Sequence, residues 1–327
     1  MANHDIIVIG GSTGALEALR RIFAGLPHDL PAALFVVTHV TSDGRDMMAG
    51  ILDAAGPIPV KTAAEGDLIA NGHAYVAPAG FHLLVDDGML RLGRGPRENM
   101  SRPAIDPTFR SAALSYGSRV IGIVLSGMLD DGAAGLAAVK RCGGITIVQN
   151  PADAVADAMP INALTACDVD YRLPVSQMAQ TLARLTEEPA SGETSRPADI
   201  ALEVEIARGR PSNTDLLTEI GKPVALSCPS CNGVLSQIND PSWLRFRCQI
   251  GHAYSAECLD REHETAVVHA IGVALRVLEE RHTLMVKMAA DAVRRGHTRS
   301  SRQFEERGID YREQADLLRK AVLDETS

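Results

Sequence analysis

The 327-residue sequence lacks any apolar run of the roughly 18 residues that a membrane-spanning helix needs. Its first five residues also lack the basic start and apolar core of a signal peptide. A net charge of −9 argues against a nucleic-acid partner. Cysteine is scarce, and the six present are not expected to form disulfides in a reducing compartment. We therefore expect a cytoplasmic protein without membrane insertion.

The glycine-rich turn at residues 10–14 lacks two common phosphate-binding patterns. It fails the dinucleotide fingerprint because Ser12 and Ala15 stand where glycines are needed, and it has no Gly-Lys-Ser/Thr ending. It does match G-x-S-x-G, between an apolar strand at 5–9 and a helical pattern at 15–23. Ser12 is therefore either an exposed nucleophile beside free helix N–H groups or a simple helix cap, and the turn alone favours neither interpretation.

Strand-like and helix-like segments alternate along the first half of the chain, which predicts an α/β fold with a doubly wound, mainly parallel sheet. Asp87-Gly88 suits a two-residue turn, so residues 81–92 predict an antiparallel hairpin beside that sheet. The expected strands are 5–10, 34–40, 74–77, 119–125 and 144–148, and the expected helices are 14–25, 43–55, 106–116, 132–142 and 176–185.

Two further strand ends carry residues that could activate a serine. His39 follows the second strand, and Asp130 and Asp131 follow the strand at 119–125. A serine hydroxyl needs an imidazole to take its proton, and the imidazole needs a carboxylate to hold its tautomer. The alternatives are a structural histidine and aspartates that cap the next helix. The residues alone do not distinguish Asp130 from Asp131.

Five motifs in order resemble the catalytic domain of the CheB protein-glutamate methylesterases over residues 1–186. They are Ile9-Gly10-Gly11-Ser12-Thr13-Gly14, Thr38-His39-Val40, Ser101-Arg102-Pro103-Ala104-Ile105-Asp106, Ser126-Gly127-Met128-Leu129-Asp130-Asp131-Gly132-Ala133 and Ala158-Met159-Pro160.

The resemblance implies a role for each matching residue. Ser12 corresponds to the nucleophile, His39 to the base and Asp131 to the orienting carboxylate, with no cofactor for catalysis. The backbone amides of Thr13 and Met128 correspond to the oxyanion hole. Arg102 lies in a family motif and is expected to be structural or to position the substrate.

The resemblance also implies a reaction and partners. It is hydrolysis of glutamyl methyl esters on a chemoreceptor or related signalling protein, releasing methanol, with glutamine deamidation as a related activity. A cognate methyltransferase and a histidine kinase system would accompany it. Because the catalytic strand begins near Asp5, we expect a stand-alone form without the family's usual receiver domain. A catalytically silent scaffold and a hydrolase of small esters are the alternatives.

The second half of the chain predicts three further segments. Residues 187–222 are rich in Pro, Ser, Gly and charge and are expected to form a linker, with a short ordered piece near 200–207. Residues 223–258 predict a small zinc-ribbon-like module. Residues 259–325 carry two apolar repeats of about 3.5 residues, which predict an antiparallel helical hairpin.

The predicted zinc ligands are Cys228, Cys231, Cys248 and His252, whose C-x2-C-x16-C-x3-H spacing suits a closed tetrahedral site. Such a site is structural, because four protein ligands leave no position for water. Cys258 is a substitute for the fourth ligand, and a metal-free pair of turns is the alternative. We hypothesise that this module and the hairpin act in docking or regulation.

Overall fold

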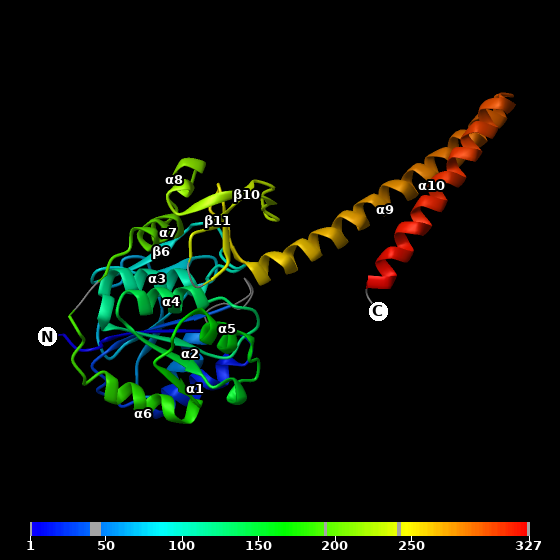
Figure 1. Ribbon diagram of the computed structural model, residues 1–327. Coiled ribbons are helices and arrows are strands. Elements are labelled where there is room, and N and C mark those ends of the chain that lie inside the picture. Colours follow the sequence, from blue (N-terminus) through cyan, green and yellow to red (C-terminus); the bar gives the residue numbers. More distant parts are fainter. Residues whose placement is uncertain (1, 40–46, 193–194, 241–242, 326–327) are drawn as a thin grey trace. The chain divides into compact units, whose positions relative to one another are not determined.

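The computed structural model describes residues 2–39, 47–192, 195–240 and 243–325 (Figure 1). The chain forms two compact units, Met1–Leu259 and Asp260–Ser327. The first unit therefore extends past the boundary expected near residue 186 and includes the Cys-rich segment. Val40 and positions 43–46 of an expected helix lie outside the described residues.

A seven-stranded sheet, counted over the described residues, forms the centre of the first unit. All of its neighbouring strands pair in parallel, in the order β3-β4-β2-β1-β7-β8-β9. The short edge strands β3 and β9 are absent from the sequence prediction, because three-residue strands carry little periodicity. The bounds are β1 Ile6–Gly11, β2 Ala33–Thr38, β3 Val60–Thr62, β4 Ala74–Val76, β7 Val120–Val124, β8 Ile145–Gln149 and β9 Tyr171–Leu173.

Helices cover both faces of this sheet (Figure 1). Alternate residues of β1 enter the two cores: Ile6 and Val8 pack on one side, and Ile7 and Ile9 on the other. The fold class is therefore confirmed as doubly wound α/β. One face carries α1 Ala15–Gly25, α2 Met47–Asp53 and α6 Val175–Leu185, and the other carries α3 Ile105–Tyr116, α4 Ala133–Arg141 and α5 Ala158–Ala166.

The antiparallel hairpin lies beside the main sheet as expected. Strand β5 (His82–Val85) pairs with β6 (Leu90–Gly93), and Gly88 takes the positive φ of 76° that the turn requires. Helix α7 (Ala198–Arg208) packs against this hairpin and α3. Residues expected to form a linker thus contain α7, at the ordered piece predicted near 200–207, followed by α8 (Thr214–Thr218).

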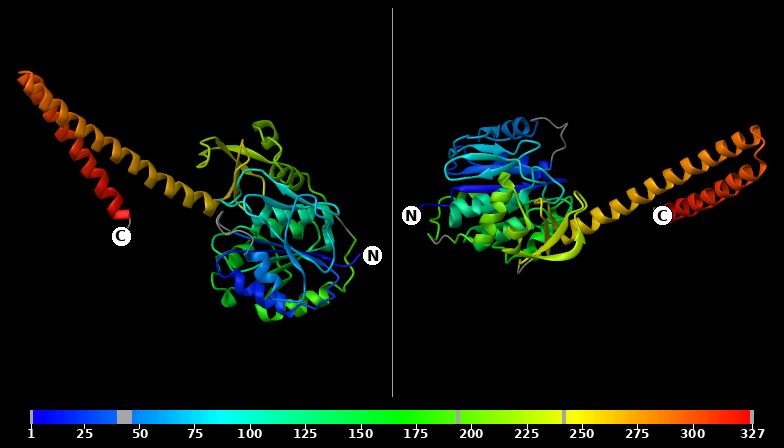
Figure 2. Two further views of the ribbon diagram at one scale, coloured as in Figure 1. Left: turned by 180° about the vertical axis from the view of Figure 1, so that it is seen from behind. Right: turned by 90° about the horizontal axis from the view of Figure 1, so that it is seen from above.

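The Cys-rich segment forms an antiparallel sheet of four strands among the described residues. Its order is β10-β11-β12-β13, with bounds Gly221–Ser227, Val234–Ile238, Arg245–Cys248 and Ala253–Ser255. Leu235, Phe246 and Tyr254 pack with the cysteines in a small core of its own. Figure 2 shows these yellow-green strands at the end of the first unit.

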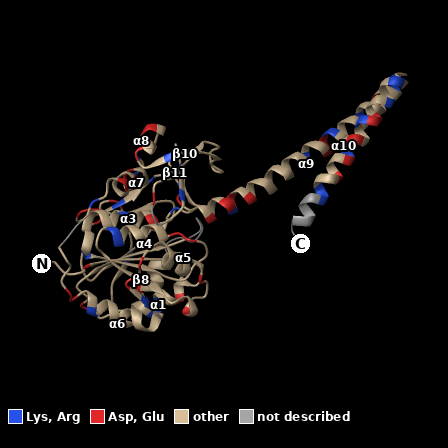
Figure 3. Cartoon of the chain, viewed as in Figure 1, with Lys and Arg blue, Asp and Glu red and all other residues tan. Residues whose placement is uncertain are grey.

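Two long helices form the second unit, as the apolar repeats predict. Helix α9 (Ala256–Arg294) and α10 (Thr298–Glu325) are joined at Gly296, whose φ is 78°. Met285, Ala289 and Ala315 are buried in this unit. Figure 3 shows charged residues of both signs distributed along the two helices. None of the helices in the described part of the chain is long and apolar enough to cross a membrane.

Candidate active site and metal centre

The candidate active site lies at the carboxyl edge of three adjacent strands. Ser12 follows β1, His39 follows β2, and residues 126–131 follow β7. The chain crosses from β1 to β2 on one side and later returns to β7 on the other. Strand β1 therefore lies at the point where the strand order reverses, which is where open α/β sheets bind ligands.

Ser126 fixes the turn that carries Ser12. The Ser12 N–H donates to the Ser126 carbonyl at 2.9 Å, and Ser126 Oγ donates to the Thr13 carbonyl at 2.7 Å. Helix α1 starts after Gly14, which has φ 82° and makes no side-chain cap. Ser12 is therefore not the cap of this helix. Gly127 lies against Ser12, since a Cβ added at Gly127 would stand 3.0 Å from Ser12 Cβ.

His39 and Asp131 are joined by a hydrogen bond of 2.7 Å from His39 Nε2 to Asp131 Oδ2. Asp131 also accepts hydrogen bonds from the N–H groups of Ile105 at 2.7 Å and Asp106 at 3.3 Å. It therefore caps α3 rather than α4, the helix that follows it on the chain. Asp130 makes no such contact: its carboxyl is buried and bonds neither His39 nor the backbone of α3. Geometry thus distinguishes the two aspartates.

The environment of this pair favours its charged form. Burial alone would lower the pKa of His39, but the hydrogen bond and negative charge of Asp131 outweigh it and raise that pKa above its usual value. Burial works to raise the pKa of Asp131, yet the bonds from His39 and the α3 backbone lower it overall. An ionised Asp131 accepts a hydrogen bond from the Nε2–H group of His39, which leaves Nδ1 as the basic nitrogen.

Ser12 Oγ makes no hydrogen bond to His39 within the part of the chain that the structure describes. Such bonds are often long without substrate and tighten when the reacting complex forms. The expected oxyanion donors adjoin this serine: Thr13 follows it on the chain, and Met128 follows Gly127, which lies against Ser12. Among the described residues, the N–H groups of Thr13 and Met128 have no partner. Two unpaired amides beside a serine suit a developing oxyanion.

Arg102 points away from these groups toward the neighbouring loop. Its Nη1 donates to the Gly95 carbonyl at 2.9 Å and lies 3.5 Å from that of Arg94. Because its guanidinium bonds the backbone of a neighbouring loop, this geometry supports a structural role for Arg102 over substrate positioning.

Sequence reasoning missed Asn99, which contacts the carboxylate of Asp131. Asn99 Nδ2 donates to Asp131 Oδ1 and Asp106 Oδ2, each at 3.1 Å. Asp106 in turn accepts the N–H groups of Gly132 and Gly135 at α4, and burial beside Asp131 raises its pKa to about 7. Asn99 lies two residues before the family motif that begins at Ser101, and this position is the sequence feature that could have indicated its role.

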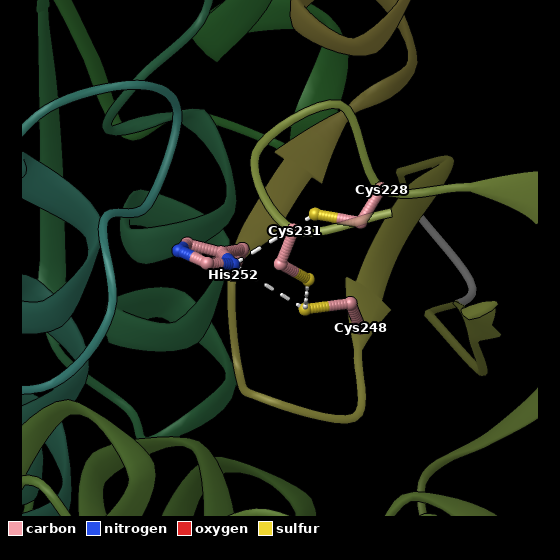
Figure 4. Close-up of side chains that lie close together, drawn as sticks. All are labelled: Cys228, Cys231, Cys248 and His252. Atoms are coloured by element: carbon pink, nitrogen blue, oxygen red, sulfur yellow. Dashed lines mark hydrogen bonds between the residues drawn. The ribbon is translucent and has the colours of Figure 1, made fainter. Parts of the chain in front are cut away.

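The four predicted metal ligands converge on one point (Figure 4). Cys231 Sγ lies 3.6 Å from Cys248 Sγ, and His252 Nδ1 lies 3.7 Å from Cys228 Sγ and 3.5 Å from Cys248 Sγ. Ligands of a tetrahedral zinc, with bonds of roughly 2.0–2.3 Å, stand about 3.5–3.8 Å apart, so this donor set fits the ion. Cys258 lies outside the group, buried in the core of the small sheet.

Backbone turns and one hydroxyl support this cluster. The Asn232 N–H bonds the Cys228 carbonyl at 2.7 Å, and that of Gly251 bonds the Cys248 carbonyl at 2.7 Å. Asn232 and Gly251 take the positive φ values, 59° and 110°. The Tyr254 hydroxyl lies 3.3 Å from Cys228 Sγ and can donate to it. Such outer contacts orient metal ligands.

A serine turn, a histidine and a buried carboxylate at one edge of a parallel sheet form an arrangement typical of serine hydrolases. A model of the family described as CheB methylesterase matches residues 7–182. The chain belongs to the CheB methylesterase family.

Individual relatives and a solved structure agree with this assignment. A protein-glutamate methylesterase/protein-glutamine glutaminase of Anaeromyxobacter dehalogenans is 37% identical over 185 residues, which are 57% of this chain and 54% of that protein. A Leptospira interrogans relative is 36% identical over 186 residues, 57% of this chain and 96% of that protein. The chain thus spans about half of the first and nearly all of the second. The CheB methylesterase catalytic domain of Thermotoga maritima matches with a TM-score of 0.54 and 33% identity, over 57% of this chain and 99% of that one.

Proposed function

We propose that this protein is a serine hydrolase that removes methyl esters from glutamate side chains of a chemoreceptor or related signalling protein. The observation that supports it most is the His39–Asp131 hydrogen bond at the strand edge that also carries Ser12. Relatives whose names give this activity support the choice of substrate.

In the proposed mechanism, Ser12 Oγ attacks the ester carbonyl while His39 Nδ1 takes its proton. The N–H groups of Thr13 and Met128 stabilise the negative oxygen that forms. As the carbon–oxygen bond breaks, His39 returns the proton to the leaving methoxide, giving methanol. Water then attacks the acyl-enzyme with His39 as base, which releases glutamate and restores Ser12. A glutamine side chain would follow the same steps with ammonia as leaving group.

The partners follow from the substrate. A methylated receptor requires a methyltransferase that supplies the ester and, in a chemosensory system, a histidine kinase that the receptor controls. Ester groups on the cytoplasmic part of a receptor would place this enzyme in the cytoplasm.

The test compares wild type with Ser12→Ala on a methylated receptor fragment, following methanol release. We expect a loss of about a thousandfold or more. Ser176→Ala, at an exposed position in α6, is the matched control and should match wild type. Equal rates for wild type and Ser12→Ala would remove Ser12 from the mechanism. Activity on small esters without receptor hydrolysis would favour the small-ester alternative, and inactivity on both would favour a scaffold.

We also infer that Cys228, Cys231, Cys248 and His252 hold a structural zinc ion, supported by the spacing of their ligand atoms. A bound ion would supply the stability that so small a core lacks. Metal analysis should find about one zinc per wild-type chain. Cys231→Ser should lose it, whereas Cys167→Ser and Cys258→Ser should retain it. Loss of zinc in Cys258→Ser would instead place Cys258 among the ligands.

A further inference from the structure

Strand β13 of the Cys-rich sheet lies directly against the loop that carries Asn99. The Asn99 N–H donates to the Ala253 carbonyl at 2.9 Å, and the Ala253 N–H donates to the Arg97 carbonyl at 3.3 Å. The side chain is bound as well, because the Ser255 N–H donates to Asn99 Oδ1 at 3.1 Å. Both the backbone and the amide of Asn99 are therefore held by β13.

The other end of the Asn99 amide contacts the candidate active site. Its Nδ2 donates to Asp131 Oδ1 at 3.1 Å, and Asp131 Oδ2 accepts from His39. A single planar amide thus connects β13 to the carboxylate that orients the histidine. Asn99 and Met100 have φ values of 46° and 64°, a left-handed backbone that persists only where surrounding contacts impose it. Met100 supplies one such contact, since it packs against the core of the Cys-rich sheet.

A second connection reaches the loop that carries Met128. Asn162 Nδ2 donates to the Leu129 carbonyl and to Glu257 Oε2, each at 3.0 Å. Glu257 lies in the first turn of helix α9, just after β13. Ser255 also caps this helix, accepting the Cys258 N–H at 3.0 Å. Residues 253–257 are therefore linked, through Asn99 and Asn162, to the loop at 126–131 that carries both Asp131 and Met128.

The candidate metal site lies immediately before β13 on the chain. His252 precedes Ala253, and the Cys248 N–H bonds the His252 carbonyl at 2.9 Å. Fixing the four ligands consequently fixes where β13 begins. Arg247, the neighbour of Cys248, bonds Glu98 beside Asn99 at 3.1 Å.

We propose that strand β13 of the Cys-rich sheet is a positioning element of the active site, which acts through Asn99 on Asp131. The inference rests on the proposed roles of Ser12, His39 and Asp131. It deepens them, because it makes the reactivity of Ser12 depend on an intact Cys-rich sheet.

The first test measures how fast full-length protein reacts with a fluorophosphonate probe, which labels an activated serine whatever its natural substrate. Asn99→Ala should lower the maximal labelling rate by at least about tenfold, the loss expected for one hydrogen bond to a charged group. The probe concentration for half-maximal rate should not change, and labelling should still reach completion. Asn71→Ala, at an exposed asparagine, is the matched control and should react as wild type does.

Two outcomes would overturn the inference alone. One is an unchanged rate in Asn99→Ala, and the other is a smaller labelled fraction at the wild-type rate, which would indicate only misfolding. A wild-type protein that the probe does not label at Ser12 would instead overturn the proposed function, and the inference with it.

The second test asks whether the effect passes through the Cys-rich sheet. Cys231→Ser should slow labelling, and Cys231→His, which keeps four ligands, should restore both metal content and rate. Because β13 and Asn99 act through the same bonds, Cys231→Ser should slow Asn99→Ala much less than it slows wild type. Equal factors in the two backgrounds, or a metal-free Cys231→Ser that reacts at the wild-type rate, would contradict the proposal.

Discussion

The charge on Asp131 determines the protonation of His39. The partly buried imidazole would otherwise have a lowered pKa, and the contact with Asp131 reverses the direction of that shift. The catalytic base must be neutral, so activity should fall as the pH decreases through the raised pKa of His39.

Asp131→Asn should therefore move the acidic limb of the pH–rate profile to lower pH, because the hydrogen bond and charge of Asp131, the main effects that oppose burial, are lost. The plateau should also fall by about a thousandfold or more, since an amide no longer selects the correct tautomer. The measurement is kcat/KM for ester hydrolysis as a function of pH. Asp168→Asn, at an exposed position, serves as control, and an acidic limb that stays in place would show that Asp131 does not set the pKa of His39.

Sequence motifs indicated that Ser12, His39 and Asp131 lie at neighbouring strand ends, and the structure places them there, while their catalytic roles stay a prediction. They could not separate capping from orientation, since Asp131 does both: it caps α3 and contacts His39. There is a physical reason why the sequence did not predict the role of Asn99. Its partner Ser255 is 156 positions away, and no local pattern indicates which strand will bind its amide.

At the scale of secondary-structure elements, a buried charge network joins α3, α7 and β12. Glu203 on α7 accepts bonds of 2.8–2.9 Å from Arg245 and Arg247 and lies 3.2 Å from Arg110 on α3. Glu98 pairs with Arg110 and Arg247, and Asp240 with Arg245. Glu203 falls in the segment expected to be a linker, but on α7 its carboxylate is buried beside three arginines.

Glu203→Gln should destabilise the first unit by about 3–5 kcal/mol, because it leaves three buried guanidinium groups with only the carboxylates of Glu98 and Asp240. Glu205→Gln in the same helix is the matched control. Glu205 pairs with Arg208 at the surface, and its loss should cost about 1 kcal/mol or less. Urea unfolding of full-length protein measures both. Similar losses in the two variants would mean that the network contributes no more than a surface pair.

At the scale of the whole molecule, we infer that the family domain of this chain depends on α7 and the Cys-rich sheet. In the Leptospira relative the matched region is 96% of the protein, so the family domain does not generally need a Cys-rich sheet. In this chain, the buried Arg110 forms an ion pair with Glu203 on α7, and Asn99 is hydrogen-bonded to β13. The dependence therefore comes from particular residues of this chain rather than from the fold.

Two truncations separate these contributions. A chain ending after Glu188 loses Glu203, both β12 arginines and β13, which leaves Arg110 paired with Glu98 alone. This shorter chain should unfold at a lower temperature and should react slowly with the probe at Ser12. A chain ending after Glu264 keeps the whole first unit and should match the full-length protein in labelling by the fluorophosphonate probe and in the unfolding of that unit. If the shorter chain were as stable and reactive as the longer one, the Cys-rich sheet would be an independent appendage. If both truncations retain probe labelling but only full-length protein hydrolyses the receptor, the helical hairpin supplies the docking that the sequence led us to expect.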